Sequence, residues 1–166
     1  MTEIIIVVLG IAVLLYVMLG GADFGAGIIE IFTGRKGIDV ISKAIAPIWE
    51  ANHIWLILAV VILFNGFPLV FAVLTTYLHI PLLIILIGII FRGTAFTFRY
   101  YDESKDKMYD YFTSFFRISS LLTPFFLGIS LGAIIFGGIP AGVNGTFYEV
   151  FILPWLNLFT LSTGVS

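Results

Sequence analysis

Long, continuous apolar runs are the feature that most restricts the fold of this chain. The first runs from Ile4 to Leu19, and three more of similar character follow it. A helix needs about 20 apolar residues to cross a hydrocarbon core of about 30 Å. Because 60% of the residues are hydrophobic and 11% are charged, the sequence indicates an integral membrane protein. The runs do not alternate between apolar and polar residues, which argues against a transmembrane β-barrel.

The runs predict an all-α membrane protein: an up-and-down bundle of four transmembrane helices, with the start of a fifth helix near the end. The expected spans are Ile4 to Phe32, about Ala44 to Phe64, about Leu69 to Phe91 with an extension towards Phe98, and about Tyr111 to Phe136. Pro47 lies near the start of the second span, where a missing N–H costs least. We assign residues 1–138 to the bundle and 139–166 to an external connection with the truncated start of the next span.

Basic residues are confined to one side of the predicted bundle. All eight Lys and Arg residues lie in or beside two connections, the loop Thr33 to Lys43 and the charged segment Arg99 to Asp110. The N-terminus and the turn Asn65 to Pro68 have none. The positive-inside rule therefore places both basic connections in the cytoplasm and the N-terminus outside.

Two carboxylates lie inside the predicted spans. Glu50 stands in the segment PIWEANHIW at 47–55, about six residues into the second span, or roughly 9 Å from its cytoplasmic end. Asp23 stands among glycines in the first span. A carboxylate within a membrane is costly and by default indicates function, with a partner or a water path. The plainer alternative is that Glu50 and Asn52 only hydrogen-bond neighbouring helices.

Helical spacing groups the polar residues around Glu50. Glu50 and His53 share one face, with Trp49 beside His53, whereas Asn52 and Trp55 project to another side. Carboxylate and imidazole can both accept and release protons, so the sequence predicts a proton pathway through Glu50, Asp23 and His53.

Two arginines and a second histidine need separate interpretations. Arg99 is best explained as a positive-inside anchor with a snorkelling side chain. Arg92 lies deeper, where pairing with an acid across the bundle is at least as plausible. His79, next to Pro81, could hydrogen-bond a carbonyl freed by a kink. Axial haem ligation by His53 or His79 is the less favoured alternative. The chain has no cysteine, which excludes thiolate metal sites.

Four segments of the sequence resemble subunit II of the cytochrome bd quinol oxidases. They are GADFGAG at 21–27, TGR at 33–35, APIWEANHIWL at 46–56 and FRGTAFTFR at 91–99. The resemblance covers roughly Gly20 to Arg99, and beyond Arg99 it lies mainly in hydropathy. Four segments in the right order and at the right intervals are together quite specific, although no single one is decisive.

The resemblance implies a respiratory complex in a prokaryotic cell membrane that oxidises quinol and reduces dioxygen to water. In that family, subunit I binds haem b and haem d and holds the quinol-oxidation site. Subunit II is a structural and proton-conducting partner that ligates no haem, and in some members it holds a quinone. The resemblance maps the family's proton-route acid onto Glu50 and a second acid onto Asp23. Asn52, Trp49, Trp55, Arg92 and Arg99 are then structural polar residues, and this chain has no metal site or catalytic residue of its own.

The sequence also departs from the family pattern. Gly20 replaces an acid, Glu50 replaces an Asp and Thr97 replaces an acid before Arg99. Family members are about twice as long, so the chain is expected to be a gene fragment, a frameshifted product or a split subunit. A second chain would then supply the missing half.

Two other functions stay open at this point. Broken, Gly-rich helices with buried carboxylates also characterise proton-coupled transporters, of which this chain would be a half-module. The third interpretation is a structural scaffold without proton traffic. In each case the expected surroundings are lipid and protein, and no nucleic-acid partner is predicted.

Overall fold

The computed structural model describes residues 2–33, 35–101, 107–136 and 147–165 of the chain. These residues form helices and no strands. The elements are α1 (Thr2–Ile29), the 3-10 helix η1 (Glu30–Phe32), α2 (Arg35–Gly66), α3 (Pro68–Tyr77), α4 (His79–Tyr101), α5 (Lys107–Ile135), α6 (Phe147–Phe151) and α7 (Leu158–Val165).

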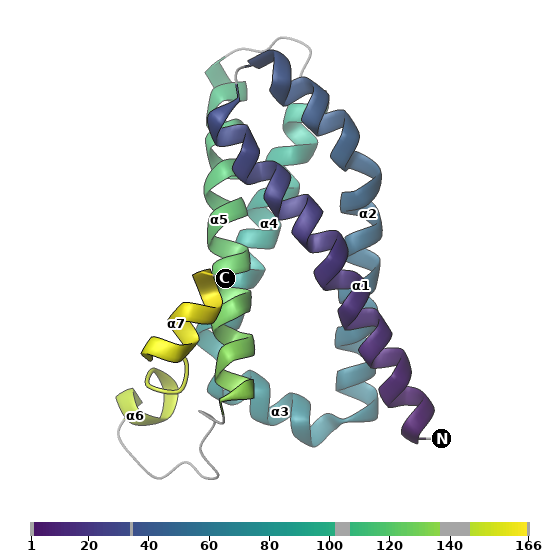
Figure 1. Cartoon of the computed structure of the whole chain (residues 1–166), viewed down its shortest axis with the longest axis vertical. Helices are drawn as coiled ribbons and strands as arrows, with labels where there is room; N and C mark the ends of the chain where they lie inside the picture. The colour runs from purple at the N-terminus through teal and green to yellow at the C-terminus, as the bar shows by residue number, and fades with distance from the viewer. Residues whose placement is uncertain (1, 34, 102–106, 137–146, 166) are drawn as a thin grey trace. The chain divides into compact units, whose positions relative to one another are not determined.

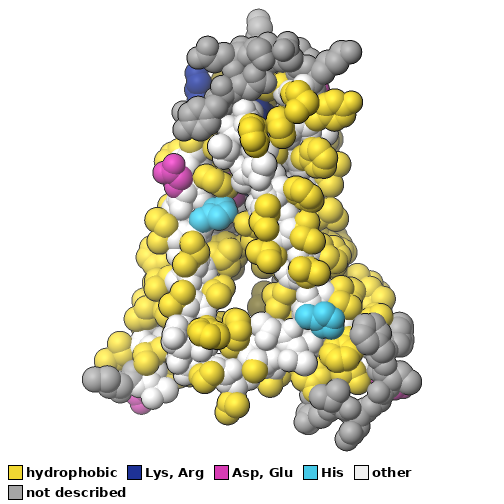
Figure 2. Space-filling model, turned by 180° about the vertical axis from the view of Figure 1, so that it is seen from behind, with side chains coloured by type: hydrophobic (Ala, Val, Ile, Leu, Met, Phe, Trp, Pro, Cys, Tyr) yellow, Lys and Arg dark blue, Asp and Glu magenta, His cyan; other side chains and the backbone are white. Residues whose placement is uncertain are grey.

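Four helical segments are long and apolar enough to cross a membrane, as the sequence predicted. They are Thr2–Phe32, Gly37–Gly66, His79–Arg99 and Met108–Ile135. Figure 2 shows that hydrophobic side chains make up most of the described surface on the face drawn there. The all-α membrane fold is therefore confirmed.

The chain divides into two compact units, Met1–Ala72 and Val73–Ser166. The first is built on the α1–α2 hairpin and the second on the α4–α5 hairpin, whose helices run antiparallel within each pair (Figure 1). The division expected at residue 138 falls in the stretch 137–146, outside the described residues.

In the α1–α2 hairpin, each helix presents one continuous buried face to the other. The buried residues of α1 are Ala12, Tyr16, Gly20, Asp23, Phe24 and Gly27. Those of α2 are Ile38, Ser42, Ile45, Asn52 and Ala59. Two close approaches define the register, because a Cβ atom at Gly20 would lie 3.6 Å from Asn52 Nδ2 and one at Gly66 would lie 3.3 Å from Ile5 Cγ2.

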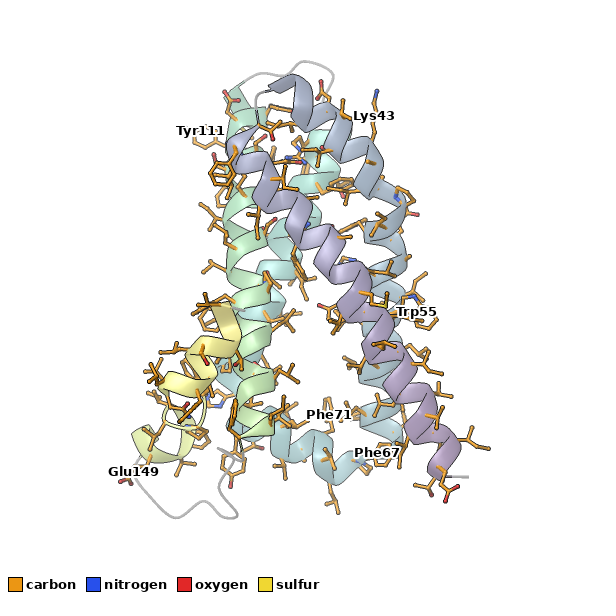
Figure 3. All side chains as sticks on the ribbon, viewed as in Figure 1. Lys43, Trp55, Phe67, Phe71, Tyr111 and Glu149 are labelled. Carbon is orange, nitrogen blue, oxygen red and sulfur yellow. The ribbon has the colours of Figure 1, made fainter. Side chains whose placement is uncertain are left out.

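The second span begins earlier than predicted. The sequence placed residues 33–43 in a loop, but α2 begins at Arg35 and runs without interruption to Gly66. Ile38, Ser42 and Ile45 are all buried, and their spacing puts them on one helical face, so packing extends the helix. Pro47 consequently lies in the interior of α2 rather than near its start, and the carbonyl of Lys43 loses its helical N–H partner. Lys43 itself projects outward from α2 (Figure 3).

The predicted third span is not one helix. α2 ends at Gly66, as the expected turn requires, and Phe67 and Phe71 lie at this corner (Figure 3). α3 and α4 then meet at Leu78. Pro81 cannot donate to the carbonyl of Tyr77, which breaks the helical hydrogen-bond ladder at this point. His79 Nδ1 lies 2.9 Å from the carbonyl oxygen of Thr76, one residue before the carbonyl that Pro81 leaves without its helical donor.

Glycines bring α7 into close contact with α5. A Cβ atom at Gly128 would lie 2.3 Å from the backbone oxygen of Thr163, and one at Gly132 would lie 2.2 Å from Thr163 Oγ1. The Thr163 hydroxyl donates to the carbonyl of Gly128 at 2.9 Å. Gly128 and Gly132 form a GxxxG pair, the spacing by which membrane helices approach closely. α7 is the helix expected to start near the end of the chain.

Reciprocal hydrogen bonds cap the start of α7. Asn157 Oδ1 accepts a hydrogen bond from the Thr160 N–H at 3.0 Å, and Thr160 Oγ1 accepts one from the Asn157 N–H at 3.1 Å. Such reciprocal bonds satisfy N–H groups at the first turn of a helix. The cap therefore fixes where α7 begins, just after the turn that follows Trp155.

We expect Gly128→Ala to separate α7 from α5. The new methyl group would meet the backbone of Thr163, which cannot move aside as a side chain can, and overpacking of this kind costs about 1–3 kcal/mol. Thermal unfolding of the purified chain in detergent should show the loss. Gly10→Ala is the control, because nothing lies within 4 Å of a Cβ atom there, and equal melting temperatures for the two variants would contradict the packing.

Candidate functional site

Glu50, His53 and Trp49 lie together on α2, as predicted. The rings of Trp49 and His53 are tilted against each other with centroids 4.7 Å apart. His53 Nδ1 lies 2.8 Å from the carbonyl oxygen of Trp49. Because a carbonyl can only accept, Nδ1 donates, and in the neutral ring Nε2 is left as the proton acceptor. Glu50 is exposed, one helical turn away from the half-buried His53.

Glu50 lies deeper along its helix than the sequence suggested. It follows Arg35, the first residue of α2, by fifteen residues, which corresponds to roughly 22 Å of helix. It falls in the middle part of the Gly37–Gly66 span. The difference arises because α2 begins before the predicted second span does.

Asp23 occupies a different surface from Glu50. Its side chain is 1% exposed, inside the α1–α2 interface, whereas Glu50 lies on the exposed side of α2. Asn52 is also buried in this interface, beside Gly20, and its Oδ1 atom has no hydrogen-bond partner among the described residues. Trp55 is half-buried, as His53 is. The predicted pathway residues therefore divide between an interior set and an exposed set.

Glu30 is a buried carboxylate that the sequence analysis missed. It begins η1, is fully buried, and follows Asp23 by seven residues. Tyr16 precedes Asp23 by the same interval and is buried as well. The signal was present in the sequence, since a seven-residue repeat places all three side chains on one helical face.

In the second unit, both arginines are buried around one aromatic ring. The guanidinium carbons of Arg92 and Arg99 lie 4.5 and 4.4 Å from the ring centroid of Phe116 on α5. Arg92 Nη1 donates to Ser120 Oγ at 2.7 Å, and Ser120 Oγ in turn donates to the carbonyl of Phe116 at 2.5 Å. The Arg99 side chain is buried, so it does not snorkel as the sequence suggested. Phe116 and Ser120 were not identifiable from the sequence, since they acquire this role only when α5 packs on α4.

The side chains of the described residues include no group of three or more His, Cys, Asp or Glu that could hold a metal ion. His53 and His79 lie in different units. The Nδ1 atom of each lies within hydrogen-bond distance of a backbone carbonyl three or four residues earlier in the chain. The carboxyl and imidazole groups of Glu50 and His53 are of the kinds that exchange protons.

Comparison with known proteins agrees with the resemblance carried by the four segments. The family described as cytochrome bd terminal oxidase subunit II matches residues 1–166. Cytochrome bd ubiquinol oxidase subunit 2 of Bacillus subtilis is 31% identical over 155 residues, which are 91% of this chain and 44% of that protein. Cytochrome bd-I ubiquinol oxidase subunit 2 of Escherichia coli K12 is 28% identical over 168 residues, covering 94% of this chain and 42% of the relative. The chain thus spans less than half the length of these relatives.

We expect Ser120→Ala to destabilise the α4–α5 hairpin by about 1.5–3 kcal/mol, because it removes a hydrogen bond to a buried charged group. Ser119→Ala is the matched control, since the hydroxyl of Ser119 bonds only to carbonyls one turn back in α5. Thermal unfolding of the two purified variants in detergent, measured side by side, checks the expected loss of stability. Equal losses would mean that the Arg92 contact contributes little.

Proposed function

Because the chain belongs to the cytochrome bd terminal oxidase subunit II family, we propose that it forms part of a quinol-oxidising, dioxygen-reducing membrane complex. The match over residues 1–166 is the observation that carries this proposal. It favours an oxidase subunit over a transporter half-module. The activity belongs to the assembled complex, and this chain is not expected to catalyse the reaction alone.

The complex supplies the redox groups in this proposal. Haem b and haem d reside in the partner subunit I, and the substrate class follows the names of the relatives, which are ubiquinol oxidases. A quinone bound to this chain, and a second chain supplying the rest of subunit II, belong to the same proposal. The complex would lie in a bacterial inner membrane with the basic connections in the cytoplasm.

Within the complex, we assign Glu50 to the transfer of protons from the cytoplasm towards the haems. Its exposure in the middle part of a membrane span supports this role, because a carboxylate facing lipid at that depth would cost several kcal/mol. A partner surface that covers Glu50 would remove this cost and receive the proton. Subunit I, the haem-bearing partner, is the surface we propose.

His53 and Trp49 give Glu50 a neighbouring base with a fixed orientation. The bond from Nδ1 to the Trp49 carbonyl holds the ring and leaves Nε2 as the basic nitrogen one turn from Glu50. The tilted indole of Trp49 restricts the ring further. A proton taken up by one group can thus pass to the other without a change in the backbone.

Glu50→Gln should slow oxygen consumption by the assembled oxidase about twofold, because an amide cannot release a proton. The haem absorption spectrum should stay normal, and Glu50→Asp should retain most of the turnover. Glu3→Gln is the matched control, since Glu3 is an exposed acid in the first turn of α1. Unimpaired turnover of Glu50→Gln would favour the structural scaffold and count against a proton role.

A further inference from the structure

We propose that the interior of the α1–α2 hairpin carries a second, water-bearing line of proton-exchanging groups, formed by Glu30, Asp23 and Tyr16 and separate from Glu50. This inference rests on the proposed function, since it adds a route to the same oxidase. Its entry residue would be Glu30, which the four segments of family resemblance do not include.

The three side chains are evenly spaced along one face of the hairpin. Glu30, Asp23 and Tyr16 recur every seven residues on the face of α1 and η1 that α2 covers. Seven residues of helix span roughly 10 Å, so the three groups follow the hairpin axis at similar intervals. Such intervals are too long for a direct proton jump, and water is needed between the groups.

Asn52 supplies an independent indication of water in this interior. Its side chain is 2% exposed, and its Oδ1 atom has no hydrogen-bond partner among the described residues. The amide faces α1 at Gly20, which lies between Tyr16 and Asp23. A buried amide oxygen nearly always accepts a hydrogen bond, and a water molecule is the partner that we propose for it. An ordered water on Asn52 would lie on the line between the phenol and the carboxyl group.

The register of the hairpin gives the line a direction. Gly20 meets Asn52 and Ile5 meets Gly66, so moving forward along α1 corresponds to moving back along α2 by about the same number of residues. This register places Glu30 level with the buried Ser42. Glu30 is then the member nearest the connection between the two helices, the side on which the basic residues lie. In transfer, each carboxyl group releases one proton and takes up another, so neither changes its net charge over a cycle.

A purely structural role for Glu30 would require only its hydrogen bonds. An amide satisfies many of those bonds but cannot exchange a proton, so the isosteric substitution separates the two roles. We expect Glu30→Gln in the assembled oxidase to slow proton uptake about twofold, followed with a pH-sensitive dye in a single turnover, and to raise the solvent deuterium isotope effect. The haem spectrum and the melting temperature should stay close to those of the unaltered complex and of Glu3→Gln.

Two further variants keep the test decisive. Glu30→Asp retains a carboxyl group and should keep most of the proton uptake. It is also the variant to measure if Glu30→Gln fails to assemble. Asn52→Leu removes the proposed water anchor and should reproduce the raised isotope effect. Unchanged proton uptake in Glu30→Gln, or an equal loss in Glu30→Asp, would overturn the inference.

The double variant Glu30→Gln/Glu50→Gln separates this inference from the proposed function. If two parallel lines operate, each single variant still takes up protons through the other line, so the double variant should lose most of the proton uptake that either single variant retains. If the double variant is only as slow as the slower single variant, the two acids share one line and the second route is refuted. A defect in Glu30→Gln alone would leave the interior line standing while the role of Glu50 fails, and the reverse result would refute only the interior line.

Discussion

The cost of placing a polar group in a hydrocarbon layer governs the arrangement of this chain. Such groups must be hydrogen-bonded, paired or covered by protein. In the first unit Asp23, Glu30 and Asn52 are covered by the contact between α1 and α2. In the second unit Arg92 and Arg99 are covered by α5, whose Phe116 ring lies under both guanidinium groups. Each hairpin therefore uses its helix–helix contact to hold charge away from lipid. Glu50 is instead exposed on α2, which is why we propose that a partner covers it.

Small residues make these contacts close. Hydrophobicity gives little drive for helices to associate in a membrane, because lipid tails are as apolar as the side chains. Gly20 lets α1 approach Asn52, Gly88 leaves room for Thr123 between α4 and α5, and Gly128 admits the backbone of α7. Close packing and polar side chains are therefore linked: the glycines allow the approach that shields the polar groups.

The separation of the acids has a functional consequence. A single pathway through Glu50 and Asp23 was the natural expectation from two carboxylates in neighbouring spans. The hairpin instead puts Asp23 in its interior with Glu30, and leaves Glu50 on the outside beside His53. An interior line can work through water held within this chain, whereas an exterior acid needs a partner surface. The proposed roles differ for this reason.

The sequence alone determined the membrane class, the number of spans and the family, because continuous hydropathy and ordered motifs are local properties of the chain. It also identified Glu50, Asp23 and Asn52 as costly in a membrane. It could not predict that residues 35–43 would be helical, because the packing of Ile38 and Ile45 against the neighbouring helix extends α2 there. Nor could it predict that Arg99 would be buried on Phe116, or which acid would face inward. Those outcomes depend on which face each helix turns towards its neighbour, and only the tertiary contacts decide that.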